Sequence, residues 1–109
     1  MVALREYLDH RGESPFSKWL HDLNAPAAAK VTSALVRIER RNFSNVKGVG
    51  GGVYECRIDF GPGYRVYFGK DGEMLVILLG GGTKKRQERD IQAAHESWKD
   101  YKHRKARGE

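Results

Sequence analysis

The stretch YECRIDFGPGYRVYF, residues 54–68, decides the fold. Apolar and polar residues alternate up to Phe60, and the alternation resumes at Tyr64 after the turn Gly61-Pro62-Gly63. Period-two alternation on both sides of such a turn predicts a β-hairpin with one apolar and one polar face. We expect Phe60 to lie opposite Tyr64, because this register gathers the apolar side chains on one face. The same register pairs Ile58 with Val66, Cys56 with Phe68, Asp59 with Arg65 and Arg57 with Tyr67.

The chain after the hairpin predicts a central strand and a helix. Asp71-Gly72 is a favoured turn dipeptide, and MLVILL at 74–79 is apolar throughout, as expected of a strand covered on both faces. After Gly80-Gly81-Gly82, Thr83 is the expected N-cap of a helix. The apolar stripe of this helix consists of Ile91, Ala94, Trp98 and Tyr101.

The residues before the hairpin predict a strand at 2–8 and two helices. Ser14-Pro15 is an N-cap followed by a proline at the first helical position, and Asn24-Ala25-Pro26 starts the second helix. A short connection favours an antiparallel helical hairpin. We therefore predict an α+β fold with a small antiparallel β-sheet, in the order β-α-α-β-β-β-α. Residues 1–109 should form a single domain, with a tail that frays from about residue 103.

The charge of the chain is basic and concentrated near its end. The 109 residues carry 20 Lys and Arg against 14 Asp and Glu, a formal net charge of +6. Residues 84–109 hold nine basic and five acidic side chains, which favours nucleic acid or an acidic protein as a partner. The longest apolar run is far shorter than the roughly 20 residues that span a membrane, and we see no signal peptide. We expect a cytoplasmic protein that does not bind membranes.

Three cations, Lys84, Lys85 and Arg86, follow the triple glycine and open the last helix. A helix start presents free backbone N–H groups and the positive end of the dipole, so this segment is a candidate phosphate-binding site. The alternative is a solvated helix start, since charge runs often serve solubility. Arg89, further along the helix, and Lys47, at the base of a glycine cluster that we expect to be a mobile loop, are further candidate phosphate contacts.

The polar face of the hairpin is expected to carry Arg57, Arg65 and Tyr67. Two arginines can hold a phosphodiester bidentately, and a tyrosine can stack on a base. A concave basic face results if the helices cover the opposite side of the sheet. The alternative is an exposed Asp59–Arg65 ion pair, with Tyr67 as ordinary strand surface.

The chain lacks the usual hydrolytic and metal-binding constellations. Its four histidines are scattered without ligand spacing, and its single cysteine, Cys56, alternates with core residues. We therefore expect no metal and no cofactor, and phosphate chemistry carried by cations.

The hairpin, the segment DGEMLVILLGGGTKKRQERDIQAA at 71–94 and the segment NFSNVKGVGGGVYE at 42–55 together resemble the RelE/ParE toxin superfamily. Within it they are similar to the addiction-module killer proteins of the HigB type. The resemblance implies the toxin of a type II toxin–antitoxin system. RelE-like members enter the ribosomal A site and cut mRNA by attack of a 2′-hydroxyl on the adjacent phosphate, whereas ParE-like members poison DNA gyrase.

Carried to this chain, the resemblance implies a metal-independent mRNA endonuclease. It implies catalytic roles for Arg57, Arg65, Lys84 and Lys85, and RNA or phosphate binding by Lys47, Tyr67, Arg86 and Arg89. The partners are mRNA, the ribosome and a cognate antitoxin, expected to be a small helix-turn-helix protein. The general acid and base stay open, because a tyrosine of RelE has no counterpart and Glu55 stands where RelE has a basic residue; Tyr67 or His95 could substitute. The alternatives are a ParE-like gyrase inhibitor and a non-catalytic nucleic-acid-binding module.

Overall fold

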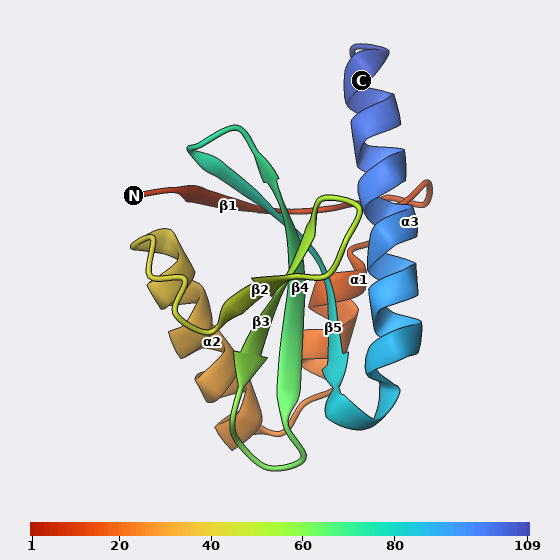
Figure 1. Cartoon of the computed structure of the whole chain (residues 1–109). Coiled ribbons are helices and arrows are strands. Elements are labelled where there is room, and N and C mark those ends of the chain that lie inside the picture. The colour runs from red at the N-terminus through yellow and green to blue at the C-terminus, as the bar shows by residue number, and fades with distance from the viewer.

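A computed structural model describes residues 1–109 as one five-stranded sheet with helices on both faces (Figure 1). The strands lie in the order β1 (Ala3–Glu6), β5 (Leu75–Thr83), β4 (Tyr64–Asp71), β3 (Val53–Ile58) and β2 (Val46–Gly48). The helices are α1 (Pro15–His21), α2 (Ala25–Glu39) and α3 (Gln87–Ala106), and a 3₁₀ turn, η1 (Lys84–Arg86), precedes α3. This arrangement confirms the predicted α+β class and places the apolar strand β5 inside the sheet.

The sheet differs from the prediction in three respects. It is mixed, because β1 runs parallel to β5 with Ala3 opposite Leu75, and the crossover that a parallel pair needs includes α1 and α2. It has an additional strand, β2, which is too short to show an alternation in the sequence. Finally, β5 continues through Gly80, Gly81 and Gly82, so the triple glycine belongs to the strand.

The hairpin of β3 and β4 has the predicted faces but a different register. Cys56 lies opposite Val66 and Ile58 opposite Tyr64, whereas Phe60 lies beyond the last pair. The Phe60 carbonyl accepts a hydrogen bond of 3.0 Å from the N–H of Gly63. Phe60 therefore belongs to the turn, which begins before Gly61-Pro62-Gly63. A shift of two residues keeps each side chain on its predicted face, because side chains alternate with a period of two. The cross-strand partners do change: Arg57 lies opposite Arg65, and Glu55 opposite Tyr67.

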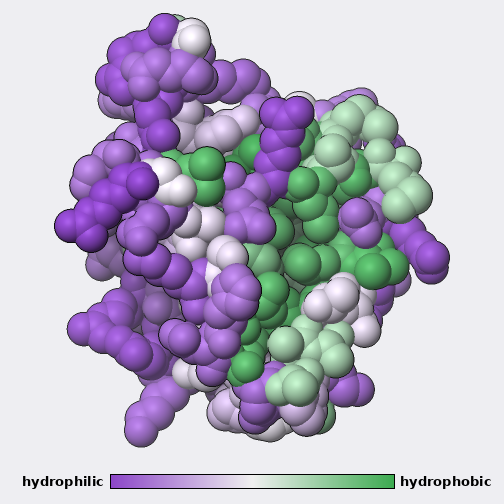
Figure 2. All heavy atoms as spheres, turned by 180° about the vertical axis from the view of Figure 1, so that it is seen from behind, coloured by the Kyte–Doolittle hydropathy of each residue, from purple (hydrophilic) through white to green (hydrophobic).

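Both faces of the sheet are covered. On one face Cys56, Val66 and Phe68 pack with α1 and α2 in the larger core, and Cys56 is buried as predicted. On the other face Tyr67 packs beneath Trp98 of α3 in a second core. The predicted concave basic face required helices on the opposite side of the sheet alone, and this condition is not met because α3 covers Tyr67. Seen from behind, apolar side chains gather over the face of α1 and α2, while the side that carries α3 is hydrophilic (Figure 2).

The helix starts agree with the sequence for α1 and α2 but not for α3. The side chains of Ser14 and Asn24 accept hydrogen bonds of 3.0 Å from backbone N–H groups of the first turns, as expected of N-caps. Thr83 instead precedes η1 and makes no capping hydrogen bond with its side chain. At its other end α3 continues to Ala106, beyond the point where we expected fraying. None of the helices combines the length and the apolar composition of a membrane-spanning segment.

Candidate functional site

The end of β5 and the β3–β4 turn meet at one end of the sheet, the lower end in Figure 1. The backbone N–H of Lys84 donates to the carbonyl of Gly63 at 2.9 Å. A Cβ atom placed on Gly63 would lie 3.6 Å from both Arg65 Nη1 and Lys84 Cβ. Two of the predicted catalytic cations are therefore close together. We call Lys47, Glu55, Arg57, Arg65 and Lys84 the sheet-end site.

Arg65 is held from below by a carboxylate. It is 6% exposed, and its Nε lies 3.2 Å from Oε1 of Glu55, an ion pair without the geometry of a hydrogen bond. The second oxygen of Glu55, Oε2, accepts a hydrogen bond of 2.7 Å from Nε2 of Gln87 at the start of α3. Glu55 is 1% exposed, so it connects β3, β4 and α3 inside the protein. The predicted Asp59–Arg65 pair is wrong, because the register differs by two residues.

Arg57 lies opposite Arg65 and remains accessible to solvent. Its Nε is 3.6 Å from Oδ1 of Asp59, and both side chains of this pair are largely exposed. Exposed pairs of this length contribute little, so the Arg57 guanidinium is available to another anion. Arg57, Lys47 and Glu55 line a groove of about 140 Å³ over the β2–β3 pair. The structure therefore places Lys47 beside Arg57, Arg57 opposite Arg65, and Lys84 at the Gly63 turn next to Arg65.

Tyr67 does not lie on an accessible face. It is fully buried, and its hydroxyl has no hydrogen-bond partner. Burial, with a smaller effect from the charges of Glu55 and Asp90, raises the pKa of Tyr67 well above its usual value. The predicted stacking of Tyr67 on a base is therefore wrong, because α3 covers this side chain. A neutral, enclosed phenol is also a poor candidate for proton transfer.

His95 lies away from the sheet-end site. One of its ring nitrogens, Nε2, is 3.0 Å from the carbonyl oxygen of Val49, in the loop between β2 and β3. A Cβ atom on Gly51 would lie 3.4 Å from the His95 ring, so this helix contact holds the glycine loop that we expected to be mobile. Of the two proposed substitutes for the missing acid or base, Tyr67 is therefore enclosed under α3 and His95 is bound to the glycine loop.

The start of α3 presents a second group of cations. Lys85, Arg86 and Arg89 are exposed, and with Glu88 and Gln92 they line an open groove of about 440 Å³. The backbone N–H of Lys84 already donates to the Gly63 carbonyl, and the first turn of α3 contains Glu88 and Asp90. The helix start therefore attracts an anion less strongly than we expected. Burial raises the pKa of Asp90, and Arg86 and Arg89 oppose this shift.

Sequence reasoning misjudged Glu55 of the site and missed its partner Gln87, which lies just outside the site. Glu55 follows the same alternation as Arg57, so its face was predictable, but its contact with Arg65 depends on the register of the hairpin. Gln87 lies 32 residues from Glu55 in the chain, and no local pattern marks it as a partner. Together they leave the sheet-end site with four cations and one buried carboxylate, an arrangement that suits a phosphodiester.

Comparison with known proteins places the chain in a family. Residues 18–102 match the family model described as phage derived protein Gp49-like (DUF891). The chain is also 45% identical over 80 residues to an uncharacterized protein of Haemophilus influenzae, an alignment that covers 72% of this chain and 81% of that protein. The matched range includes every residue of the sheet-end site. The chain therefore belongs to the Gp49-like family of phage-derived proteins, a family of RelE/ParE-like toxins.

Proposed function

We propose that this protein is the toxin of a type II toxin–antitoxin system and that it cleaves mRNA on the ribosome. Membership of the Gp49-like family supports the toxin assignment. The observation that most supports phosphate chemistry is that Arg57 lies opposite Arg65, that Lys84 begins beside the same Gly63 turn as Arg65, and that the buried carboxylate of Glu55 holds Arg65. Its physiological partner is a cognate antitoxin that inhibits it, for which a small helix-turn-helix protein is our expectation.

In the proposed reaction the 2′-hydroxyl of the substrate attacks the adjacent phosphorus. A base removes the hydroxyl proton, the bond from phosphorus to the 5′-oxygen breaks, and an acid protonates that leaving oxygen. Negative charge grows on the phosphoryl oxygens in the transition state, so fixed cations lower the barrier. We assign one phosphoryl oxygen to Arg57, which is exposed, and a second contact to Arg65, which Glu55 holds in place.

Lys84 is the residue that we assign to proton transfer from the 2′-hydroxyl, and in this step it accepts the proton as the neutral amine. Its side chain begins beside the guanidinium of Arg65, so a phosphate bound there lies within reach of its amine. Lys85, Arg86 and Arg89 would hold the flanking RNA backbone along the start of α3. Lys47 would do the same beside Arg57.

The test is cell-free translation with the purified protein, followed by primer extension on the translated mRNA. Arg57→Ala and Lys84→Ala should each lower the cleavage rate by about a hundredfold or more, as when one transition-state contact is removed. Lys99→Ala is the matched control, since it removes another exposed cation farther along α3. Arg65 is unsuitable as the first target, because its replacement disturbs a buried ion pair.

Other outcomes would point to other functions. Intact mRNA on translating ribosomes at inhibitory protein concentrations would refute the endonuclease. Trapped DNA cleavage complexes of gyrase with untouched mRNA would select the gyrase inhibitor. RNA binding that weakens steeply with salt, without any product, would select the binding module.

A further inference from the structure

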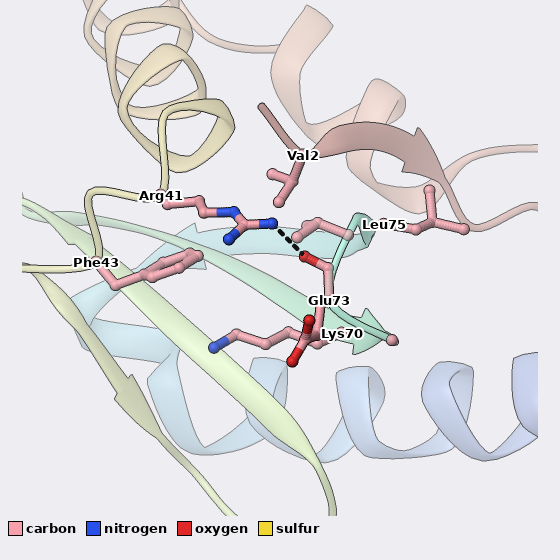
Figure 3. A pocket seen from close by; sticks show the side chains of 8 residues that line it. Val2, Arg41, Phe43, Lys70, Glu73 and Leu75 are labelled. Carbon is pink, nitrogen blue, oxygen red and sulfur yellow. Dashed lines mark hydrogen bonds between the residues drawn. The ribbon is translucent and has the colours of Figure 1, made fainter.

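A second concave site lies at the opposite end of β4, where α2 ends and β4 turns into β5 (Figure 3). Its apolar lining is formed by Val2, Phe43, Leu75 and Val76, and it encloses about 260 Å³. Small-molecule sites usually measure roughly 300–1,000 Å³. The pocket is therefore better matched to one or two side chains of another protein than to a cofactor.

The rim of this pocket carries two cations without counter-charges. The ammonium of Lys70 lies 4.4 Å from the ring centroid of Phe43 and 4.5 Å from that of Tyr54. The guanidinium of Arg41 crosses the pocket and donates to the backbone carbonyl of Glu73 at 3.5 Å (Figure 3). Neither cation forms an ion pair within this chain, and neither does the carboxylate of Glu73, the one acidic residue of the lining.

Arg41 reaches the rim from a backbone conformation that arginine rarely adopts. Its φ is 60°, and it is the only non-glycine residue of the chain with a positive φ. It directly follows the C-cap of α2, and its N–H donates to the Ile38 carbonyl at 2.9 Å, a helix ending that usually employs glycine. An arginine at this position makes the fold less stable than a glycine would, yet it places a side chain over the pocket. This combination suggests a function for that side chain.

The surroundings of the pocket are apolar as well as basic. Met74 and Met1, which are 53% and 78% exposed, are two of the four large hydrophobic residues that the fold leaves open. Met74 follows Glu73, Met1 precedes Val2, and the N–H of Ala3 donates to the Met74 carbonyl at 2.8 Å. Flexible methionine side chains adapt readily to a bound surface.

We propose that this pocket is a docking site for an acidic segment of a partner protein. The segment would insert one bulky apolar side chain above Val2 and Phe43 and place carboxylates beside Arg41 and Lys70. Charge complementarity carries this choice of occupant, because the unpaired cations on the rim outnumber its single acid. The inference goes beyond the proposed function and does not depend on RNA cleavage, since the pocket and the sheet-end site are at opposite ends of β4.

The test is an NMR titration of the isotope-labelled full chain with the synthetic peptide acetyl-Glu-Asp-Leu-Phe-Glu-Asp-amide. Saturable shifts are expected at the methyl groups of Val2, Leu75 and Val76. Two control peptides separate the contribution of charge from that of the apolar side chains. One replaces the four acids by lysine, and the other replaces Leu-Phe by Ser-Ser. Each should bind at least about tenfold more weakly, the change that a difference of one favourable contact produces.

Two substitutions of Arg41 make the inference falsifiable without loss of the fold. Arg41→Glu should lower the affinity for the acidic peptide by about tenfold. Arg41→Gly should weaken it too, while the melting temperature stays level or rises because the backbone strain is relieved. Lys30→Glu is the matched control, since Lys30 is an exposed lysine that also lies over an aromatic ring, 5.5 Å from the centroid of Phe60. It should leave binding unchanged.

Three results would overturn the docking site. The first is equal binding of the acidic and the lysine peptides, which would mark a non-selective cavity. The second is a set of shifts confined to Lys84–Arg89, which would show that the acidic peptide only follows the basic start of α3. The third is unchanged binding in Arg41→Gly and Arg41→Glu.

Discussion

The buried pair of Glu55 and Arg65 is the residue-scale feature on which both the fold and the proposed site depend. Both charges are buried. Arg57, which is exposed, lies directly opposite Arg65 on the neighbouring strand. Two arginines directly opposite each other repel, and the carboxylate of Glu55 offsets that repulsion from within the protein. The pair therefore lets the hairpin carry two arginines side by side.

Removing Glu55 should lower the free energy of unfolding by more than a surface substitution does. In Glu55→Ala the guanidinium of Arg65 is buried without a counter-charge, so we expect a loss of about 3–5 kcal/mol in the free energy of unfolding, measured by urea denaturation. The double variant Glu55→Met/Arg65→Met removes both charges and should lose less. A loss below about 1 kcal/mol in the single variant would mean that the pair is solvated and contributes like a surface pair.

Arg41→Gly should stabilise the protein. A left-handed conformation disfavours a side chain by about 1–2 kcal/mol, so glycine should raise the free energy of unfolding by about 1 kcal/mol. The urea midpoint should rise at an unchanged slope. Arg40→Gly is the control, because Arg40 has a φ of −87° at the C-cap and gains nothing from glycine. Equal effects of the two substitutions would contradict the strain that we ascribe to Arg41.

At the scale of elements, β5 owes its position to two glycines that permit close approach. A Cβ atom on Gly81 would lie 2.2 Å from the ring of Trp19 in α1, and one on Gly82 would lie 1.8 Å from Oδ2 of Asp90 in α3. A Cβ atom on Gly80 would meet nothing within 4 Å. The glycines that the sequence suggested as a connector therefore allow helices to pack on both faces of one strand.

Gly80 and Gly81 should consequently respond differently to alanine. Gly81→Ala should cost about 1–3 kcal/mol of stability, because Trp19 must move out of its packed position. Gly80→Ala should change stability by less than about 0.5 kcal/mol, as is usual where no contact is disturbed. Thermal denaturation of the two variants measures the difference. Identical melting temperatures would show that α1 does not rest on β5 at Gly81.

The middle of α3 is fastened to β4 by a tyrosine whose titration should be visible at alkaline pH. The Tyr101 hydroxyl donates to Asp71 Oδ2 at 2.5 Å, and burial together with this bond raises the pKa of Tyr101 to about 12. A pKa above its unfolded value means a contribution that is complete below about pH 10 and is lost as pH rises through about 12. Urea midpoints should fall between these pH values, and less so in Tyr101→Phe. An equal fall in both proteins would contradict the assignment.

For the whole molecule, the excess of cations predicts how RNA binding depends on salt. Each phosphate that the protein neutralises on a single strand changes the slope of log K against log salt by about 0.7. Arg57→Ala/Lys84→Ala should therefore reduce the slope by about 1.4 in titrations with a single-stranded RNA oligonucleotide. Lys99→Ala/Lys102→Ala removes the same charge from the middle of α3 and should leave the slope nearly unchanged. Equal reductions in both double variants would mean diffuse binding to the net charge.

The prediction from sequence was most accurate where a property is local. Alternation assigned the correct faces of β3 and β4, and the N-caps Ser14 and Asn24 lie where the sequence places them. It was least accurate where a property depends on how elements meet. The register shifted with the length of a turn, and Tyr67 became inaccessible because α3 packs on its face.

The sequence by itself determined the α+β class, the apolar strand β5, the buried Cys56 and the supply of cations, because periodicity and composition act within one segment. Only the tertiary structure decided that Glu55 is the partner of Arg65, that Lys84 lies with Arg65 at the Gly63 turn and that Arg41 lines a second pocket. Such contacts join segments far apart in the chain, as with Glu55 and Gln87, which are 32 positions apart. Their free energy arises from burial and charge pairing after the elements have packed, so no local pattern contains it.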